Sequence, residues 1–296
     1  MSTLTDAPVV VGVDGSPAGL RAVRLGAAEA ALRRRPLRLV HAFIWKVLGV
    51  AAGRPEGGRP DEGLRPQAER MLDEAVAVAR EAAPGLPVGG EVLDGEAAAV
   101  LLRESTRATM IVLGDGGLGR FTSLLVESVA IQVTAKADCP VLVARGEERP
   151  GPVVVGVDSS PVSELAVDFA AQEASLRGTE LVTVHAYTHP ESVGPGDLQP
   201  LVYDPRALRG DEERLVAEAT AGLADRYPDL VVRHEAVRGR PAPTLVDRSG
   251  EAALVVVGAV GRGSVTGLLL GSVSQALLHH ARCPLAMVHG LPEGMA

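Results

Sequence analysis

A glycine-rich segment near the end of the chain has the composition of an anion-binding loop. It covers Val257–Ser274 and places Gly258, Gly261 and Gly271 so that Ser272 follows the last glycine. Glycine has no Cβ, so its backbone N–H can approach an anion closely. The segment leads into a stretch of helical period, and the free N–H groups and dipole of a helix start favour phosphate. The segment therefore predicts a phosphate site.

Two shorter patterns stand where short hydrophobic runs end. Gly156–Asp158 closes one run and His185–Ala186 closes the next, and the same patterns occur earlier as Gly12–Asp14 and His41–Ala42. In an open parallel sheet, ligands bind beyond the carboxyl ends of the strands, where the strand order reverses. We therefore expect the acid, the His-Ala pair and the glycine-rich loop to meet at that edge.

The chain repeats itself at an offset of 144 residues. From Pro8 to Ala42, 20 of 35 residues are identical with their partners in 152–186. The same offset also aligns later pairs: Gly114 with Gly258, Gly117 with Gly261, Gly119 with Gly263, Ser128 with Ser272, and Cys139-Pro140 with Cys283-Pro284. This register indicates a duplication. We expect two repeats of one fold, domain 1 at residues 1–147 and domain 2 at residues 148–296, which meet in the polar segment Arg145–Gly151.

Each half alternates short β-branched runs with longer alanine-rich segments of helical period. The runs are nearly continuous in hydrophobicity, which is typical of strands buried on both faces. The expected strands of the first half are 9–13, 37–43, 88–93, 110–114 and 141–144, and its expected helices are 18–34, 67–83, 97–107 and 127–137.

These elements need a fold in which helices connect parallel strands. Ser16-Pro17 and Ser160-Pro161 have the pattern of an N-cap followed by proline in the first helical turn. Segments 46–66 and 188–205 are rich in Gly and Pro and are expected to be loops. The predicted class is α/β, with two repeated doubly wound five-stranded parallel-sheet domains of Rossmann-like, flavodoxin-like or adenine nucleotide alpha hydrolase-like type.

Both halves resemble the universal stress protein family, and the whole chain is similar to its tandem two-domain members. The resemblance covers residues 8–288, and the second-half loop matches the family pattern of glycine, two residues, glycine, nine residues, glycine and serine. It implies ATP as the ligand, with or without Mg²⁺: the loop takes the phosphates and ribose, Asp158 lies near the ribose and adenine, and Ala186 gives backbone contacts to adenine. The implied nucleotide-binding residues are Gly156, Asp158, Ala186, Val257, Gly258, Gly261, Arg262, Gly263, Ser264, Gly271, Ser272, Val273 and Ser274.

The first half departs from this pattern at two positions. Glu127 stands where the third glycine belongs, and Asp115 adds an acid to the loop. A carboxylate beside a triphosphate costs on the order of 1 kcal/mol at a few ångströms in water. Alternatively, Glu127 complements the helix dipole with its side chain turned away. We expect the first site to be the weaker one, and its candidate residues are Gly12, Asp14, Ala42, Gly114, Gly117, Gly119, Arg120, Ser128 and Val129.

Other residues with chemical potential have simpler interpretations. The rings of His279-His280 diverge by about 100° around a helix, so this pair is a poor metal site and no metal ligand is expected. His41 and His185 could touch a ligand, but packed, hydrogen-bonded histidines are the simpler interpretation. Cys139 and Cys283 are repeat equivalents, and no disulfide between them is expected.

No catalytic residue is nominated. Asp158 and Ser272 stand near the expected phosphates, but no pair of a base and its orienting group accompanies them. The sequence contains neither a Walker loop nor the dinucleotide fingerprint after the first strand. Arg33–Arg35 is expected to be a solvated helix end, and Glu29 and Glu173 are expected at the surface.

Composition limits the partners. With 29 Lys plus Arg against 37 Asp plus Glu, the formal charge is -8, and the chain has few aromatic residues, so nucleic acid and anionic membrane surfaces are unfavourable partners. Lys46 and Lys136 are the only lysines. The N-terminus lacks a signal-like segment and no apolar run approaches the ~20 residues of a spanning helix, so we expect a cytoplasmic protein without a membrane span.

The leading functional hypothesis is an ATP-binding universal stress protein that acts as a nucleotide-dependent regulatory or stress-response factor. Two alternatives remain open: a weak ATP hydrolase, which would be an enzyme of slow turnover, and a nucleotide-free interaction module. Besides an adenine nucleotide, the expected partner is a second repeat. Each final strand, at 141–144 and 285–289, would otherwise expose an apolar edge, which predicts an internal pseudo-dimer or a homodimer. The sequence identifies no further protein partner.

Overall fold

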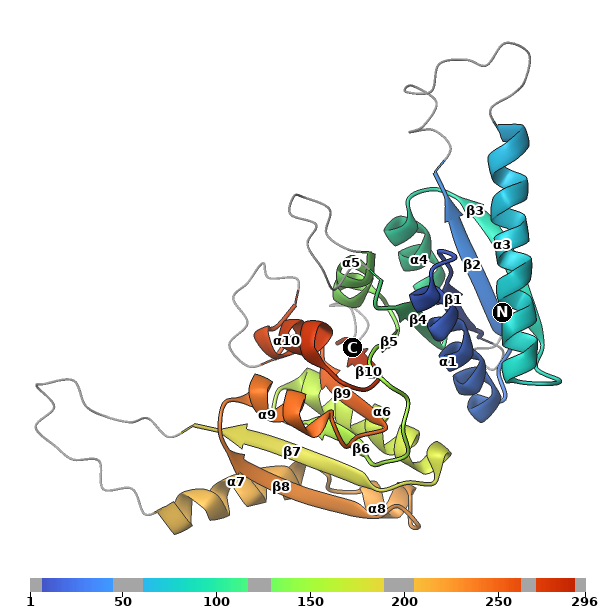
Figure 1. Ribbon diagram of the computed structural model, residues 1–296. Coiled ribbons are helices and arrows are strands. Elements are labelled where there is room, and N and C mark those ends of the chain that lie inside the picture. The colour runs from blue at the N-terminus through green and yellow to red at the C-terminus, as the bar shows by residue number, and fades with distance from the viewer. Residues whose placement is uncertain (1–6, 45–60, 117–128, 189–204, 262–269, 291–296) are drawn as a thin grey trace, which may run out of the picture. The chain divides into compact units, whose positions relative to one another are not determined.

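The computed structural model describes residues 7–44, 61–116, 129–188, 205–261 and 270–290 (Figure 1). Its contacts divide the chain into two compact units, of which unit 1 runs up to Arg145 and unit 2 covers Gly146–Gly290. Each unit contains one five-stranded parallel sheet with helices on both faces. The prediction of two repeated doubly wound α/β sheets is therefore confirmed.

Unit 1 has the strand order β3-β2-β1-β4-β5, and all of its strand pairs are parallel. Its described elements are β1 (Val9–Gly12), α1 (Pro17–Arg33), β2 (Leu37–Phe43), α3 (Asp61–Ala82), β3 (Val88–Asp94), α4 (Ala97–Ser105), β4 (Met110–Gly114), α5 (Val129–Lys136) and β5 (Val141–Ala144). Helices α1 and α3 pack together on one face, and α4 and α5 pack together on the other. The strand order reverses between β1 and β4, and open α/β sheets bind ligands beyond the carboxyl ends of the strands at such a point.

Unit 2 repeats this topology with the order β8-β7-β6-β9-β10. Its described elements are β6 (Val153–Gly156), α6 (Pro161–Arg177), β7 (Leu181–Tyr187), α7 (Pro205–Ala219), α8 (Leu223–Arg226), β8 (Val232–Arg238), α9 (Pro241–Arg248), β9 (Leu254–Gly258), α10 (Ser272–His280) and β10 (Leu285–Val288). Helix α6 covers β6 and β9, and α9 packs beside α10. The reversal of strand order lies between β6 and β9.

The central strands and the first helix of each unit form as the sequence predicts. Val9 and Val153 are fully buried, as continuous hydrophobic runs require. Ser16 caps α1 by accepting a hydrogen bond from the Gly19 N–H at 3.0 Å, and Ser160 caps α6 in the same way. A proline follows each cap at the first helical position, where its missing N–H costs nothing.

Helix α3 begins earlier than predicted. Residues 61–66 belong to it although they were expected in a loop, and Pro66 lies inside the helix. A buried stripe of Ala68, Leu72, Ala75 and Ala79 holds α3 in place, and this tertiary packing outweighs the one hydrogen bond that Pro66 removes. Pro205 likewise opens α7 instead of ending a loop. The remainder of both expected loops, 45–60 and 189–204, lies outside the described residues.

Two glutamates expected at the surface are buried. Glu29 is 0 % exposed and Glu173 is 1 % exposed. Glu29 pairs with Arg33 one helical turn later, and Glu173 pairs with Arg177 at 3.2 Å. Each pair neutralises its own charges, which makes burial of both groups tolerable. The prediction of a solvated helix end therefore also fails at Arg33, whose side chain is 6 % exposed.

Candidate functional site

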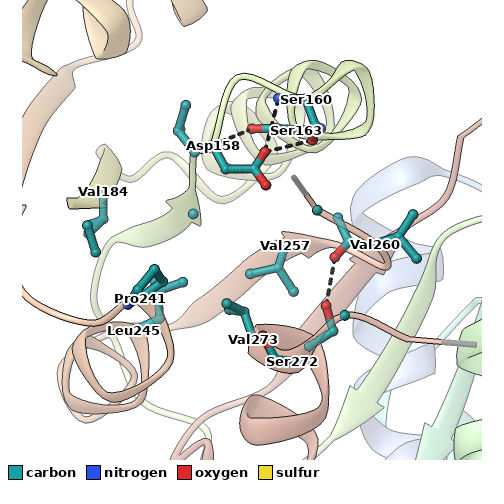
Figure 2. A pocket seen from close by; sticks show the side chains of 17 residues that line it. Asp158, Ser160, Ser163, Val184, Pro241, Leu245, Val257, Val260, Ser272 and Val273 are labelled. Atoms are coloured by element: carbon teal, nitrogen blue, oxygen red, sulfur yellow. Dashed lines mark hydrogen bonds between the residues drawn. The ribbon is translucent and has the colours of Figure 1, made fainter. Parts of the chain in front are cut away.

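Unit 2 contains a pocket of about 380 Å³ at the carboxyl ends of β6, β7 and β9 (Figure 2). Its walls come from these strand ends, from the first turns of α6, α9 and α10, and from the start of the glycine-rich loop. The lining residues are Gly156, Val157, Asp158, Ser160, Ser163, Val184, Ala186, Pro241, Leu245, Val257, Gly258, Val260, Gly261, Gly271, Ser272, Val273 and Ser274. Asp158, Ala186 of β7 and the start of the glycine-rich loop thus line one pocket, as the repeat pattern suggested.

Asp158 is held in a fixed orientation at one side of this pocket. Its Oδ1 accepts hydrogen bonds from the Ser160 N–H at 3.0 Å and from the Ser160 Oγ–H at 2.6 Å. The Asp158 N–H donates to the Ser163 Oγ at 3.2 Å. Ser159 adopts a left-handed φ of 60°, a conformation that costs energy for a residue with a Cβ. The strained turn therefore holds the Asp158 carboxylate at the pocket.

The glycines of the loop make room for close approach. A Cβ on Gly261 would lie 2.5 Å from the Asp158 Oδ2, and one on Gly258 would lie 2.8 Å from the Val162 Cγ1. Contacts this short do not occur in native structures, so a side chain at either position would force its neighbour to move. The backbone at this side of the pocket is consequently accessible without a side chain in front of it.

The start of α10 presents backbone donors at the same place. Gly271 is its N-cap, has extended backbone dihedrals and provides no side chain to cap the helix. The first N–H groups of a helix have no intrahelical acceptor, so those of Ser272 and Val273 are available to an anion. The Ser274 Oγ–H donates to the Gly258 carbonyl at 2.8 Å, which ties the helix start to the end of β9. The residues present therefore fit a phosphate.

The opposite part of the pocket is apolar. Val184 and Ala186 come from β7, and Pro241 and Leu245 come from α9; Figure 2 shows Pro241 and Leu245 on the side away from Asp158. Such a slot suits a flat, weakly polar ring. Ala186 was predicted from the sequence, and the other three residues were not. The available signal was that Pro241 begins a helix after a strand that ends at the same sheet edge.

The two strand-end histidines are packed, hydrogen-bonded residues. His41 Nδ1 lies 2.7 Å from the Val13 carbonyl oxygen, and His185 Nδ1 lies 2.6 Å from that of Val157. His185 Nε2 is also 3.0 Å from Glu212 of α7. Neither ring lines the described pocket. The simpler interpretation of both histidines is confirmed.

The histidine pair and the two cysteines form no metal-binding or reactive site among the described residues. His279 and His280 are exposed at the end of α10, with ring centroids 6.2 Å apart. Within the described residues, no group of His, Cys, Asp and Glu side chains could hold a metal ion. Cys139 and Cys283 are free and buried, and burial raises the pKa of each thiol to about 12. Both are therefore inert hydrophobic side chains at neutral pH.

The structure describes some of the candidate nucleotide-binding residues of the first half. Asp14 has the same local geometry as Asp158, with Oδ1 accepting from the Ser16 N–H at 3.0 Å and the Ser16 Oγ–H at 2.7 Å. Asp115 is paired with Arg21 at 2.6 Å and lies 3.9 Å from Arg145. The expected charge penalty of Asp115 is thus largely compensated. The candidates that lie outside the described residues are Gly117, Gly119, Arg120, Glu127 and Ser128 in the first half and Arg262, Gly263 and Ser264 in the second.

Fold and pocket together define an α/β protein built as a tandem repeat, with a pocket at the carboxyl ends of the strands of unit 2. The model of the universal stress protein family matches residues 7–145 and again residues 151–289. This chain belongs to the universal stress protein family.

Two relatives agree with this assignment, and a solved structure shares the fold. Universal stress protein Rv2005c of Mycobacterium tuberculosis is 40% identical over 289 residues, which cover 94% of this chain and 95% of the relative. Universal stress protein Rv2623 of the same organism is 38% identical over 290 residues, which cover 94% of each chain. The crystal structure of a universal stress protein from Archaeoglobus fulgidus shares the fold with a TM-score of 0.70 at 18% identity, covering 98% of this chain and 100% of that one.

Among the described helices, none is both long and apolar enough to cross a membrane.

Proposed function

We propose that the chain binds an adenine nucleotide, ATP, in the unit 2 pocket and works in the cytoplasm as a nucleotide-dependent regulatory factor of the stress response. One observation carries the proposal: an apolar slot and an uncapped helix start face a single pocket of about 380 Å³. A base and a phosphate chain need these two surfaces side by side.

Each wall has a separate role in this proposal. Val184 and Leu245 enclose the base, and the backbone of Ala186 gives it polar contacts. Asp158, whose Oδ1 is already occupied by Ser160, orients toward the ribose hydroxyls. The first N–H groups of α10 bind phosphate oxygens. Mg²⁺, where present, would be held by the phosphates, since the described residues offer no metal-binding cluster.

Little turnover is expected from this arrangement. A hydrolase needs a base within hydrogen-bond reach of the attacking water and a group that orients that base. Among the described pocket residues, Asp158 is the one titratable side chain, and its Oδ1 is engaged with the start of α6. Nucleotide occupancy would then act by biasing conformation or assembly through differential affinity.

The decisive experiment analyses the protein as purified, without added nucleotide, by mass spectrometry of the ligand released on denaturation. Titration calorimetry with ATP follows on ligand-free protein. Bound ATP or a calorimetric binding event supports the proposal, and the lack of both contradicts it and favours a nucleotide-free interaction module. Phosphate release above background under saturating ATP would favour the hydrolase alternative.

We also propose that the two repeats are separate domains, residues 1–147 and 148–296. The two family matches and the division of contacts near Arg145 support this boundary. Limited proteolysis should cut first within Arg145–Gly151 and leave two resistant fragments.

A further inference from the structure

The two repeats carry opposite charges at one corresponding position. In unit 1, β3 ends at Asp94 and continues into Gly95-Glu96, and at the same offset of 144 residues β8 of unit 2 ends at Arg238 and continues into Gly239-Arg240. The glycine is kept while both flanking charges are reversed. This tripeptide connects the third strand of each sheet to the following helix, so the inversion lies at the ligand-binding edge of the fold.

The basic version borders the unit 2 pocket directly. Arg240 is the N-cap of α9, and the next residue, Pro241, lines the pocket. The Gly239 N–H donates to the Tyr187 carbonyl at 2.9 Å, which fixes the tripeptide beside the end of β7, next to the pocket residue Ala186. Both arginine side chains are exposed. The described residues provide no hydrogen-bond or ion-pair partner for the Arg240 guanidinium.

Helix α9 also packs beside α10, whose start is the expected phosphate position. Helices α9 and α10 pack against each other, and each follows a strand that ends at the same sheet edge. Packed helix axes are about 8–10 Å apart, so an extended arginine at the start of α9 covers most of the distance to the start of α10. Arg240, which lies next to the pocket residue Pro241, can therefore bring a positive charge to the ligand, and none of the described pocket residues carries one.

From this juxtaposition we infer that Arg240, assisted by Arg238, is a specificity-determining residue that selects adenine nucleotides with several phosphates over AMP and adenosine. The inference rests on the proposed function and adds the class of nucleotide preferred. Glu96 in unit 1 is exposed at the matching position and opposes the same ligands. Guanidinium groups suit this role because they stay protonated and bind phosphate oxygens in pairs.

The test compares the whole chain with Arg240→Glu and Arg240→Gln variants, using calorimetric titration with ATP, ADP, AMP and adenosine. One charge contact at about 4 Å in a watery site changes affinity roughly fivefold. Arg240→Gln should therefore weaken ATP binding about fivefold, and Arg240→Glu, which reverses the charge, about 25-fold. The loss should shrink from ATP to AMP and vanish for uncharged adenosine. Arg107→Glu is the matched control, because it changes the net charge equally at an exposed residue beyond the far end of α4.

Each outcome decides a different point. An equal loss for ATP and adenosine would overturn the inference, because it would indicate damage to the pocket. Unchanged ATP affinity in Arg240→Glu would overturn it as well while leaving the proposed function intact. Failure of the unmodified chain to bind any of the four ligands would overturn the proposed function and this inference together. Similar losses in Arg107→Glu would assign the effect to net charge and also contradict a specific role for Arg240.

Discussion

Gly271→Glu tests the pocket at its most informative position, because Glu127 occupies the corresponding place in the first half. A Cβ on Gly271 would lie 3.5 Å from the Gly261 nitrogen and 3.6 Å from the Ala259 oxygen, which are ordinary contacts. The φ of Gly271 is -67°, a value that any residue adopts. The variant should therefore fold.

Its carboxylate would stand at the helix start that the phosphates need. It would compete for the N–H groups of α10 and repel the phosphate charge, and each effect is worth about 1 kcal/mol. Together they predict ATP binding weakened by roughly 30-fold, or about 2 kcal/mol. Gly271→Gln has nearly the same size without the charge and should keep more of the affinity. Gly271→Ala should change it least.

Titration calorimetry measures the affinities, and circular dichroism with thermal melting establishes that each variant is folded. The reasoning would be refuted if folded Gly271→Glu bound ATP as tightly as the unmodified chain, since the start of α10 would then lie away from the phosphates. Equal losses in the Glu and Gln variants would assign the effect to bulk and remove the electrostatic part of the argument.

Three further predictions concern stability, reactivity and assembly. Ser160→Ala removes the cap of α6 and should lower stability by about 1–2 kcal/mol, seen as a fall in the thermal midpoint of a few degrees; an unchanged midpoint would contradict the capping role. Cys139 and Cys283, whose thiol pKa values burial raises to about 12, should react with a thiol reagent at pH 8 only after unfolding, and rapid labelling of the folded chain would contradict their burial. Residues 1–147 expressed alone should form a dimer or aggregate, because β5 pairs within its own unit only with β4, and a stable monomer in ultracentrifugation would argue against this.

The sequence predicts the fold well because several independent signals agree. Continuous valine runs such as Val9–Val11 indicate buried strands, and the Ser16-Pro17 pattern marks the start of the helix that follows. Signals fail where a local rule competes with packing. Pro66 suggests a loop, but the buried stripe of α3 holds the helix around it. Glu29 suggests a surface position by its charge, although it stands seven residues after Ala22 on the buried side of α1.

The pocket residues fall into the same two groups: some follow from a local sequence pattern, and others are set by packing. Gly258 and Gly261 are predictable because close approach demands glycine at fixed positions in one loop. Pro241 is predictable only as the start of a helix at that sheet edge. Leu245 is not predictable, because α9 reaches the pocket through the packing of the sheet, and an apolar residue on a helix looks the same whether it faces core or ligand. Contacts between elements distant in sequence set the apolar slot, and no local pattern records them.

The charge difference between the two repeats is therefore clearer at the start of the helix after the third strand than at Asp115 in the glycine-rich loop. Asp115 is paired with Arg21, so part of its negative charge is already compensated at the edge of unit 1. Glu96 stands at the N-cap of α4, and Arg240 stands at the equivalent N-cap in unit 2, so the two repeats carry opposite charges there. Charge at this helix start can change without disturbing the sheet, since the side chains are exposed and the glycine between them is retained. Under our proposal, the two repeats share one fold and differ in nucleotide preference through these exposed residues.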